Sequence, residues 1–201
     1  MTKRNIKQPH IRDIDVIDLI LIDHRFIKEC VETLGNEKAD KNLKLTMAKG
    51  FLEALALHSV AEKNIVYDRL QEDEEFHFNI LEAQIEHGIV DEKVKLLKPV
   101  VAHTKVLKDE LEAELKVLAM LVKKHIKEEE SELLPKMREQ IDEETLKNMG
   151  EAFMKARNMS SNDLRDYPQL QDELVTWKDD VQKVSSQFLS KMDKYVENLK
   201  H

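Results

Sequence analysis

The chain has 201 residues and a formal net charge of −8, from 32 Lys and Arg against 40 Asp and Glu. This acidic balance, with no cluster of Lys or Arg interleaved with aromatic residues, argues against a nucleic-acid surface. The single cysteine excludes an intrachain disulfide, and no segment approaches the roughly 20 apolar residues that cross a bilayer. We therefore expect a cytoplasmic protein with neither nucleic-acid nor membrane partners.

Few turn-forming residues, four Gly and four Pro, predict an all-α protein with long helices. After an N-terminal arm over residues 1–12, amphipathic spacing predicts helices over about 13–34, 43–70, 74–98 and 109–134. Pro99 ends or kinks the third, Asp109 and Glu112 read as a capping box for the fourth, and Pro135 limits it. These helices form an up-and-down four-helix bundle, over residues 13–137.

Residues 138–201 read as a C-terminal helical extension that packs on the bundle or on a second copy. It contains a helix over about 142–157 and another over about 171–199. The apolar seam of the last helix, from Val181 to Leu199, would allow a homodimer.

Two helices carry the same motif, a histidine followed four residues later by a glutamate. His125 and Glu129 share one helical face with Leu118, Leu121 and Val122, so the pair continues an apolar stripe. His58 and Glu62 repeat this arrangement on the second helix. Because a buried carboxylate is costly unless it is paired or metal-bound, a shared metal centre is the simplest explanation.

His24 and His87 stand on the apolar stripes of the other two helices. The midpoints between successive groups fall near residues 42, 73 and 107, in or beside the predicted connections. At a rise of about 1.5 Å per residue, all four helices can therefore place their groups in one layer. Imidazole and carboxylate ligands without thiolates suit iron, manganese or zinc.

The order His24, His58-x-x-x-Glu62, Glu86-His87, His125-x-x-x-Glu129 resembles the hemerythrin-like, or HHE cation-binding, family. The resemblance implies two non-haem iron ions with carboxylate bridges and, in some members, an oxo bridge. Its matching metal ligands are His24, His58, Glu62, His87, His125 and Glu129.

The sequence departs from the oxygen-carrying hemerythrins in its third and fourth helices. Those proteins have a second histidine one turn from the third-helix histidine, where this chain has Ala83 and Asp91. They also use an aspartate five residues after the last histidine, where this chain has Glu129 at four. One iron should therefore be more open, unless Asp91 fills the gap; a surface aspartate is the alternative.

Other polar residues near the predicted site leave alternatives open. Glu86, Glu128 and Glu130 are either surface charges or partners that orient a ligand imidazole. Tyr67 is close along the chain but angularly displaced from Glu62, so we expect it in the core. The wall of the ligand pocket is predicted from apolar residues at the same level: Leu21, Leu55, Ile65, Ile80, Leu118 and Leu121.

The favoured function is binding or reduction of dioxygen, peroxide or nitric oxide, in sensing or in protection against oxidative or nitrosative stress. One alternative is iron storage or delivery without turnover. Another is a histidine phosphotransfer or interaction bundle, which would need an exposed histidine. The sequence does not decide whether the protein is an enzyme.

Overall fold

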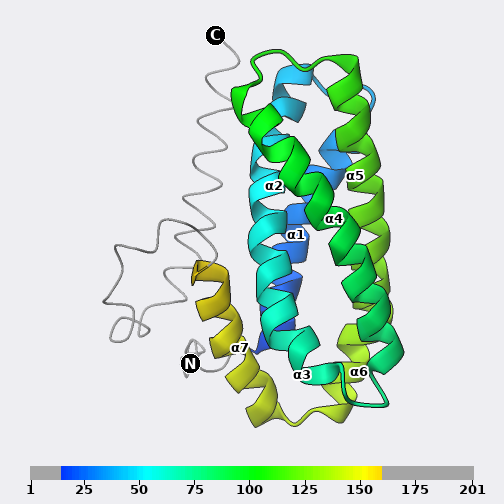
Figure 1. Ribbon diagram of the computed structural model, residues 1–201, viewed down its shortest axis with the longest axis vertical. Coiled ribbons are helices and arrows are strands. Elements are labelled where there is room, and N and C mark those ends of the chain that lie inside the picture. The colour runs from blue at the N-terminus through cyan, green and yellow to red at the C-terminus, as the bar shows by residue number, and fades with distance from the viewer. Residues whose placement is uncertain (1–14, 160–201) are drawn as a thin grey trace, which may run out of the picture.

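A computed structural model describes residues 15–159, and all of its regular elements are helices (Figure 1). The four long ones are α1 (Val16–Gly35), α2 (Lys41–Glu62), α4 (His77–His103) and α5 (Asp109–Glu128). Two π-helical turns, η2 (Lys63–Tyr67) and η3 (Glu129–Leu133), extend α2 and α5. The shorter helices are α3 (Asp68–Leu70), α6 (Leu134–Gln140) and α7 (Glu143–Met159).

The predicted four-helix bundle is confirmed. α1 packs against α2 and α5, and α4 packs against the same two helices, so the four surround one interior. α7 lies outside this ring, against α1 and α2, where Leu146, Met149 and Phe153 are buried. The predicted N-terminal arm and the predicted helix over 171–199 lie outside the described residues.

Two apolar clusters fill the interior. One lies toward the α1–α2 connection and includes Ile27, Phe51 and Leu118. The other lies toward the α5–α6 end and includes Ile20, Tyr67 and Phe153. The polar layer with the predicted metal ligands separates the two clusters.

Two local expectations from the sequence were wrong, for the start of α5 and for Pro135. Asp109 and Glu112 form no capping box, since the N-cap of α5 is Lys108 without a side-chain hydrogen bond. The two carboxylates instead bind Lys41 and Lys44 of α2, at 2.6 and 2.5 Å. The side chains of Asp109 and Glu112 thus form ion pairs with α2 in place of hydrogen bonds to the first turn of α5.

Pro99 does not end the third helix, which was one of its two expected effects, and Pro135 does not limit the fourth. α4 continues through Pro99 to His103. The helix after η3 continues through Pro135 to Gln140, because Pro135 occupies the first turn of α6, where a missing amide is tolerated.

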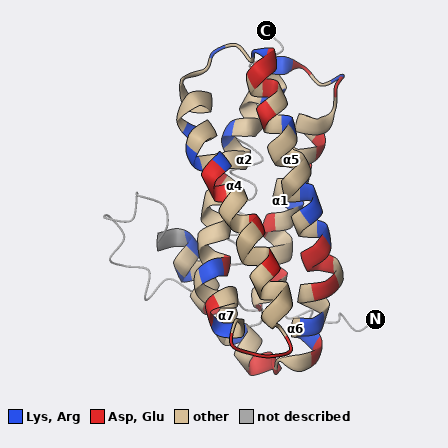
Figure 2. Ribbon diagram, turned by 45° about the vertical axis from the view of Figure 1, so that its right-hand side comes forward, with Lys and Arg blue, Asp and Glu red and all other residues tan. Residues whose placement is uncertain are grey.

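Charged residues of both signs cover the outside of the bundle. In the view of Figure 2, acidic and basic segments are interspersed along the helices. Cross-helix ion pairs such as Lys93 with Glu114, at 2.6 Å, fit this pattern. Within residues 15–159, no helix has an apolar run long enough to span a bilayer.

Candidate metal centre

The six residues predicted as metal ligands lie together in one buried layer. None of them is more than 5% exposed. They are His24 on α1, His58 and Glu62 on α2, His87 on α4, His125 on α5 and Glu129 at the start of η3. A phosphotransfer histidine must be accessible, so this burial gives no support to the phosphotransfer alternative.

The donor atoms form two groups of four, and both glutamates belong to each group. His24 and His58 complete the first group, and His87 and His125 complete the second. Within each group, the donor atoms lie within 4.8 Å of one another. The arrangement therefore offers two cation positions, each with two imidazoles and both shared carboxylates.

Every imidazole turns its Nε2 atom toward a shared carboxylate. The separations are 3.2–3.3 Å, for His24 and His125 to Glu129 and for His58 and His87 to Glu62. Four of the inward atoms make no hydrogen bond: His24 Nε2, His58 Nε2, Glu62 Oε1 and Glu129 Oε2. Buried polar atoms without partners are costly, and a cation among them would remove that cost. The donor set therefore fits a metal centre.

The Nδ1 atoms of His24 and His125 point outward to carboxylates. His24 Nδ1 lies 3.1 Å from Glu130 Oε1, and Lys28 binds the same carboxylate at 2.8 Å. His125 Nδ1 lies 2.8 Å from Glu86 Oε2. Glu86 is in turn bound by Lys124 at 2.7 Å, and Glu128 also pairs with that lysine. Glu86 and Glu130 thus contact imidazoles and can orient them, which was one of the two roles considered for these glutamates. Glu128 has the other role, as a surface charge paired with Lys124.

His87 reaches its outer carboxylate through a hydroxyl. Its Nδ1 lies 3.0 Å from Ser59 Oγ, which donates to Asp91 Oδ1 at 2.7 Å. The other oxygen of Asp91 pairs with Lys63. Asp91 therefore faces away from the clustered donors and belongs to neither group of four.

His58 has an outer partner that sequence reasoning missed. Its Nδ1 lies 3.5 Å from Asp23 Oδ2, and Arg157 of α7 binds Asp23 Oδ1 at 2.9 Å. A signal for Asp23 was present, because it stands between Ile20 and Ile27 on the buried stripe of α1. Nothing local pointed to Arg157, which is 134 positions farther along the chain (157 − 23).

Tyr67 also enters the layer, contrary to expectation. It is fully buried, as predicted, but its hydroxyl lies 3.3 Å from Glu62 Oε2. The expected displacement assumed a regular α-helix. In η2 the amide of Asp68 binds the carbonyl of Lys63, five residues back, and this wider turn brings Tyr67 toward the face of Glu62.

A family comparison agrees with this geometry. The model of the hemerythrin HHE cation-binding domain matches residues 15–137, more than half of the chain. The chain belongs to the hemerythrin HHE family. No curated protein and no solved structure matches it.

In this hemerythrin-family protein, α7 lies beyond the matched segment and yet contacts the metal layer through Arg157 and Asp23. The layer therefore has one outer partner from outside the family domain. Position 83, one turn before His87, holds a buried alanine, as the sequence shows.

The two shared carboxyl groups differ in their pKa. Burial and the charge of Glu129 raise the pKa of Glu62 to about 7. Burial would also raise the pKa of Glu129, but His125 and His24 outweigh it and hold that pKa well below its usual value. Without metal, Glu62 is therefore partly protonated near pH 7, and this proton offsets part of the buried negative charge.

The imidazoles also differ in the direction in which their pKa values are shifted. Burial lowers the pKa of His24 and of His125, but the neighbouring Glu129 outweighs it and both values are raised. Burial and the charge of His125 lower the pKa of His87 to about 3. In the metal-free protein, protons on His24 and His125 thus hold positive charge where cations would bind.

A small cavity adjoins the layer on the side of His58, His87 and His125. Its volume of about 10 Å³ is close to the room needed by one water molecule. The apolar side chains that line it are Ile27, Leu55, Val90, Val122 and Ile126. Of the predicted wall, only Leu55 lines this cavity.

Leu21 and Leu121, which were also predicted in the wall, are 37% and 36% exposed. The apolar stripes of α1 and α5 are wider than the sector that the bundle buries. That prediction was therefore wrong for both residues.

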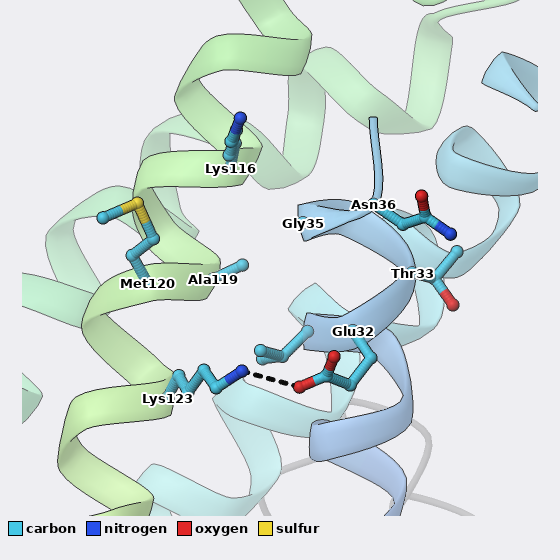
Figure 3. Close-up of a pocket in the computed structure, with 9 residues that line it drawn as sticks. Glu32, Thr33, Gly35, Asn36, Lys116, Ala119, Met120 and Lys123 are labelled. Carbon is cyan, nitrogen blue, oxygen red and sulfur yellow. Dashed lines mark hydrogen bonds and ion pairs between the residues drawn. The ribbon is translucent and has the colours of Figure 1, made fainter. Parts of the chain in front are cut away.

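A larger hollow of about 470 Å³ lies on the surface between α1 and α5 (Figure 3). Glu32 and Lys123 form an ion pair across it at 2.7 Å. None of the clustered histidines or glutamates lines this hollow, so it has no part in the metal layer.

Proposed function

We propose that this protein holds two iron ions in the buried layer and uses them to bind or reduce a small ligand of the size of dioxygen, peroxide or nitric oxide. The observation that carries the proposal is the pair of four-donor groups with both glutamates in common. Manganese and zinc suit the same donors, and the family relationship favours iron.

The ligands divide into end positions and bridges. His24 and His58 would hold one ion, His87 and His125 would hold the other, and Glu62 and Glu129 are the two residues common to both groups. When bound, the iron pair supplies open coordination positions and can exchange electrons with the small ligand.

The outer partners of the imidazoles hold the rings in place. Nδ1 of His24, His87 and His125 each bonds to a carboxylate or a hydroxyl, which fixes the ring orientation and leaves Nε2 for the metal. Nδ1 of His58 lies 3.5 Å from Asp23 Oδ2, without a hydrogen bond. The cavity beside His58 and His87 is about the size of one water molecule, and most of its lining side chains are apolar. This small volume supports a diatomic ligand or peroxide over a larger substrate.

The experiment is anaerobic iron loading of the full chain, followed by metal analysis and optical spectra under oxygen, peroxide and nitric oxide. We expect about two iron ions per chain and spectral changes with at least one of the ligands. His58→Ala should lose iron, because it removes a donor of the first group. His103→Ala, at an exposed histidine outside the layer, is the matched control and should load normally.

Two results would overturn the proposal. Wild-type protein that binds fewer than about two metal ions per chain would contradict the paired site. Loaded protein whose spectrum responds to none of the three ligands would contradict the ligand chemistry.

A further inference from the structure

We propose that Tyr67 is a seventh protein ligand, whose phenolate oxygen binds the ion held by His87 and His125. This inference rests on the proposed iron centre and adds a residue to it. Tyr67 is the only tyrosine in residues 15–159 and is fully buried.

The hydroxyl of Tyr67 lies among donor atoms of the second group. It is 2.9 Å from Glu129 Oε1, 3.0 Å from His87 Nε2 and 3.3 Å from Glu62 Oε2. All three residues belong to the group that contains His125. The phenol oxygen therefore already occupies the position of a fifth donor to that group.

The hydrogen-bond partners of His87 show which of its nitrogens has the free lone pair. The carboxylate of Asp91 can only accept, so the Ser59 hydroxyl donates its hydrogen there. Ser59 Oγ must then accept from Nδ1–H of His87, which leaves Nε2 as the bare nitrogen. This nitrogen is the one that faces Tyr67.

The single hydroxyl hydrogen of Tyr67 cannot satisfy three acceptors. A carboxylate oxygen from each of Glu62 and Glu129 and the lone pair of His87 all face the same phenol oxygen. In the metal-free protein, His125 adds a proton to this cluster, since its Nε2 lies 2.9 Å from Nε2 of His87. A metal ion would take the place of these protons among the converging lone pairs. A metal ion there would bind the phenol oxygen together with the other three atoms.

The π-turn η2 is the backbone feature that makes this contact. It follows Glu62 directly and ends at Tyr67, and π-turns within α-helices occur frequently at functional sites. A second π-turn, η3, begins at Glu129, the other shared carboxylate. The helix register therefore changes beside each shared glutamate.

Tyr67 makes the two metal positions unequal. Ala83 offers no donor at the third-helix position, and Asp91 is turned outward to Ser59 and Lys63. Tyr67 supplies an oxygen to the His87 end, whereas the His24 and His58 end has no tyrosine within the described part of the chain. We expect the ion at the His87 end to be the more strongly stabilised in the ferric state, because phenolate is an anionic oxygen ligand.

The chemical change on binding is a ligand exchange without electron transfer. The O–H bond of Tyr67 breaks, its proton leaves to the solvent, and the phenolate gives a lone pair to ferric iron. Tyrosine is not oxidised, and the iron remains ferric.

The test is the visible spectrum of the iron-loaded, air-oxidised full chain. Ferric phenolate ligation produces a charge-transfer band, and resonance Raman excitation within that band enhances tyrosine ring vibrations. We expect wild-type protein to show both. Tyr67→Phe should lose the charge-transfer band and the enhanced tyrosine vibrations and should still bind the iron ion at the His24 and His58 end. Tyr167→Phe, the matched control, should keep the band and the vibrations.

Isotopic labelling gives a readout that does not depend on a variant. In wild-type protein grown with ring-deuterated tyrosine, the enhanced vibrations should shift. This measurement shows whether a tyrosine binds the iron even if Tyr67→Phe fails to fold, and Tyr67 is the only tyrosine within residues 15–159.

The outcomes separate this proposal from the previous one. Protein that binds two iron ions but shows no tyrosine vibrations overturns the Tyr67 assignment and leaves the iron centre intact. An unchanged spectrum in Tyr67→Phe does the same. Protein that binds no iron overturns both proposals.

Discussion

Arg157 Nη2 lies 2.9 Å from Asp23 Oδ1, and the other oxygen of Asp23 faces His58 Nδ1 at 3.5 Å. Through these contacts, α7 reaches the imidazole of His58 in the buried layer although it lies beyond the segment that the family model matches. The extension therefore contributes to the metal layer as well as to the core.

Replacing Arg157 by leucine should weaken metal binding. Asp23 would keep its buried charge without the guanidinium, and His58 would lose a fixed orientation. Changes to outer partners of this kind typically lower metal affinity about 10- to 100-fold. Competition with a chelator measures the effect.

Two further variants sharpen this test. Arg157→Lys keeps the positive charge and should recover part of the affinity. Lys155→Ala changes an exposed residue of the same helix and should leave affinity unchanged. Equal affinities of Arg157→Leu and wild type would show that α7 has no role in holding the metal.

Glu62→Gln should have opposite effects on the metal-free and metal-loaded protein. Without metal, burial disfavours the Glu62 carboxylate, and its pKa is raised from 4.5 to about 7. Above pH 7, the neutral amide should therefore stabilise the metal-free protein by on the order of 3 kcal/mol. With metal, the variant lacks a bridging carboxylate and should lose at least one ion.

Chemical denaturation of both forms measures these changes in the free energy of unfolding. Glu53→Gln, at an exposed position of the same helix, is the control. A Glu62→Gln protein that retained both ions would contradict the bridging role.

The stability of the metal-free protein should decrease as the pH rises above about 6.5. The pKa of Glu62 is raised, so the stability that this group contributes is present below its unfolded value and is lost as the pH rises through about 7. The pKa values of His24 and His125 are raised above 6.5 too, so the stability that these histidines contribute is also lost as the pH rises above that value.

His87 has the opposite dependence, and below pH 6.5 it opposes the loss from Glu62, so the net decrease in stability is expected above that pH. Its pKa is lowered to about 3, so its contribution increases from pH 3 up to the unfolded value of 6.5 and is constant above it. Bound metal replaces the protons on the other groups, so the loaded protein should stay stable above pH 7. Thermal unfolding of both forms between pH 5 and about 9 checks this; parallel curves would contradict it.

The ion pair between Lys44 and Glu112 should respond unequally to the loss of either partner. Lys44 is 2% exposed and its ammonium lies 2.5 Å from Glu112, whose side chain is 24% exposed. Glu112→Gln leaves a buried ammonium without its carboxylate and should cost about 1–3 kcal/mol. Lys44→Met should cost less, because the remaining carboxylate can reach water and Lys41.

Urea denaturation of the two variants gives the comparison. Glu110→Gln, in the same first turn of α5 but without this pairing, is a suitable control. A larger loss of unfolding free energy in Lys44→Met than in Glu112→Gln would contradict the argument that the buried Lys44 ammonium depends on Glu112.

The spacing of residues along the chain was enough to predict the layer of six. His58 with Glu62 and His125 with Glu129 share a helical face because of the α-helical period, which is a local property. The equal distances of the groups from the connections then fixed their common level. No long-range information was needed for either step.

The same local period could not predict which apolar faces are buried. α4 carries apolar side chains on both faces: Ile80, Val90 and Val94 are buried, whereas Phe78, Ile85 and Ile89 are at least 50% exposed. Leu21 and Leu121 were misplaced for this reason. Burial depends on which neighbouring helices cover a face, and this follows only from packing.

The sequence by itself determined the four helices, the family and the six residues of the buried layer, because hydrophobic period and helix rise act over a few residues at a time. Only the tertiary structure decided the position of Tyr67, the outward turn of Asp91 and the contact of Arg157 with Asp23. A π-turn is a change of one residue in hydrogen-bond register, which composition does not reveal. An ion pair across 134 positions (157 − 23) exists only once helices distant in sequence have packed together.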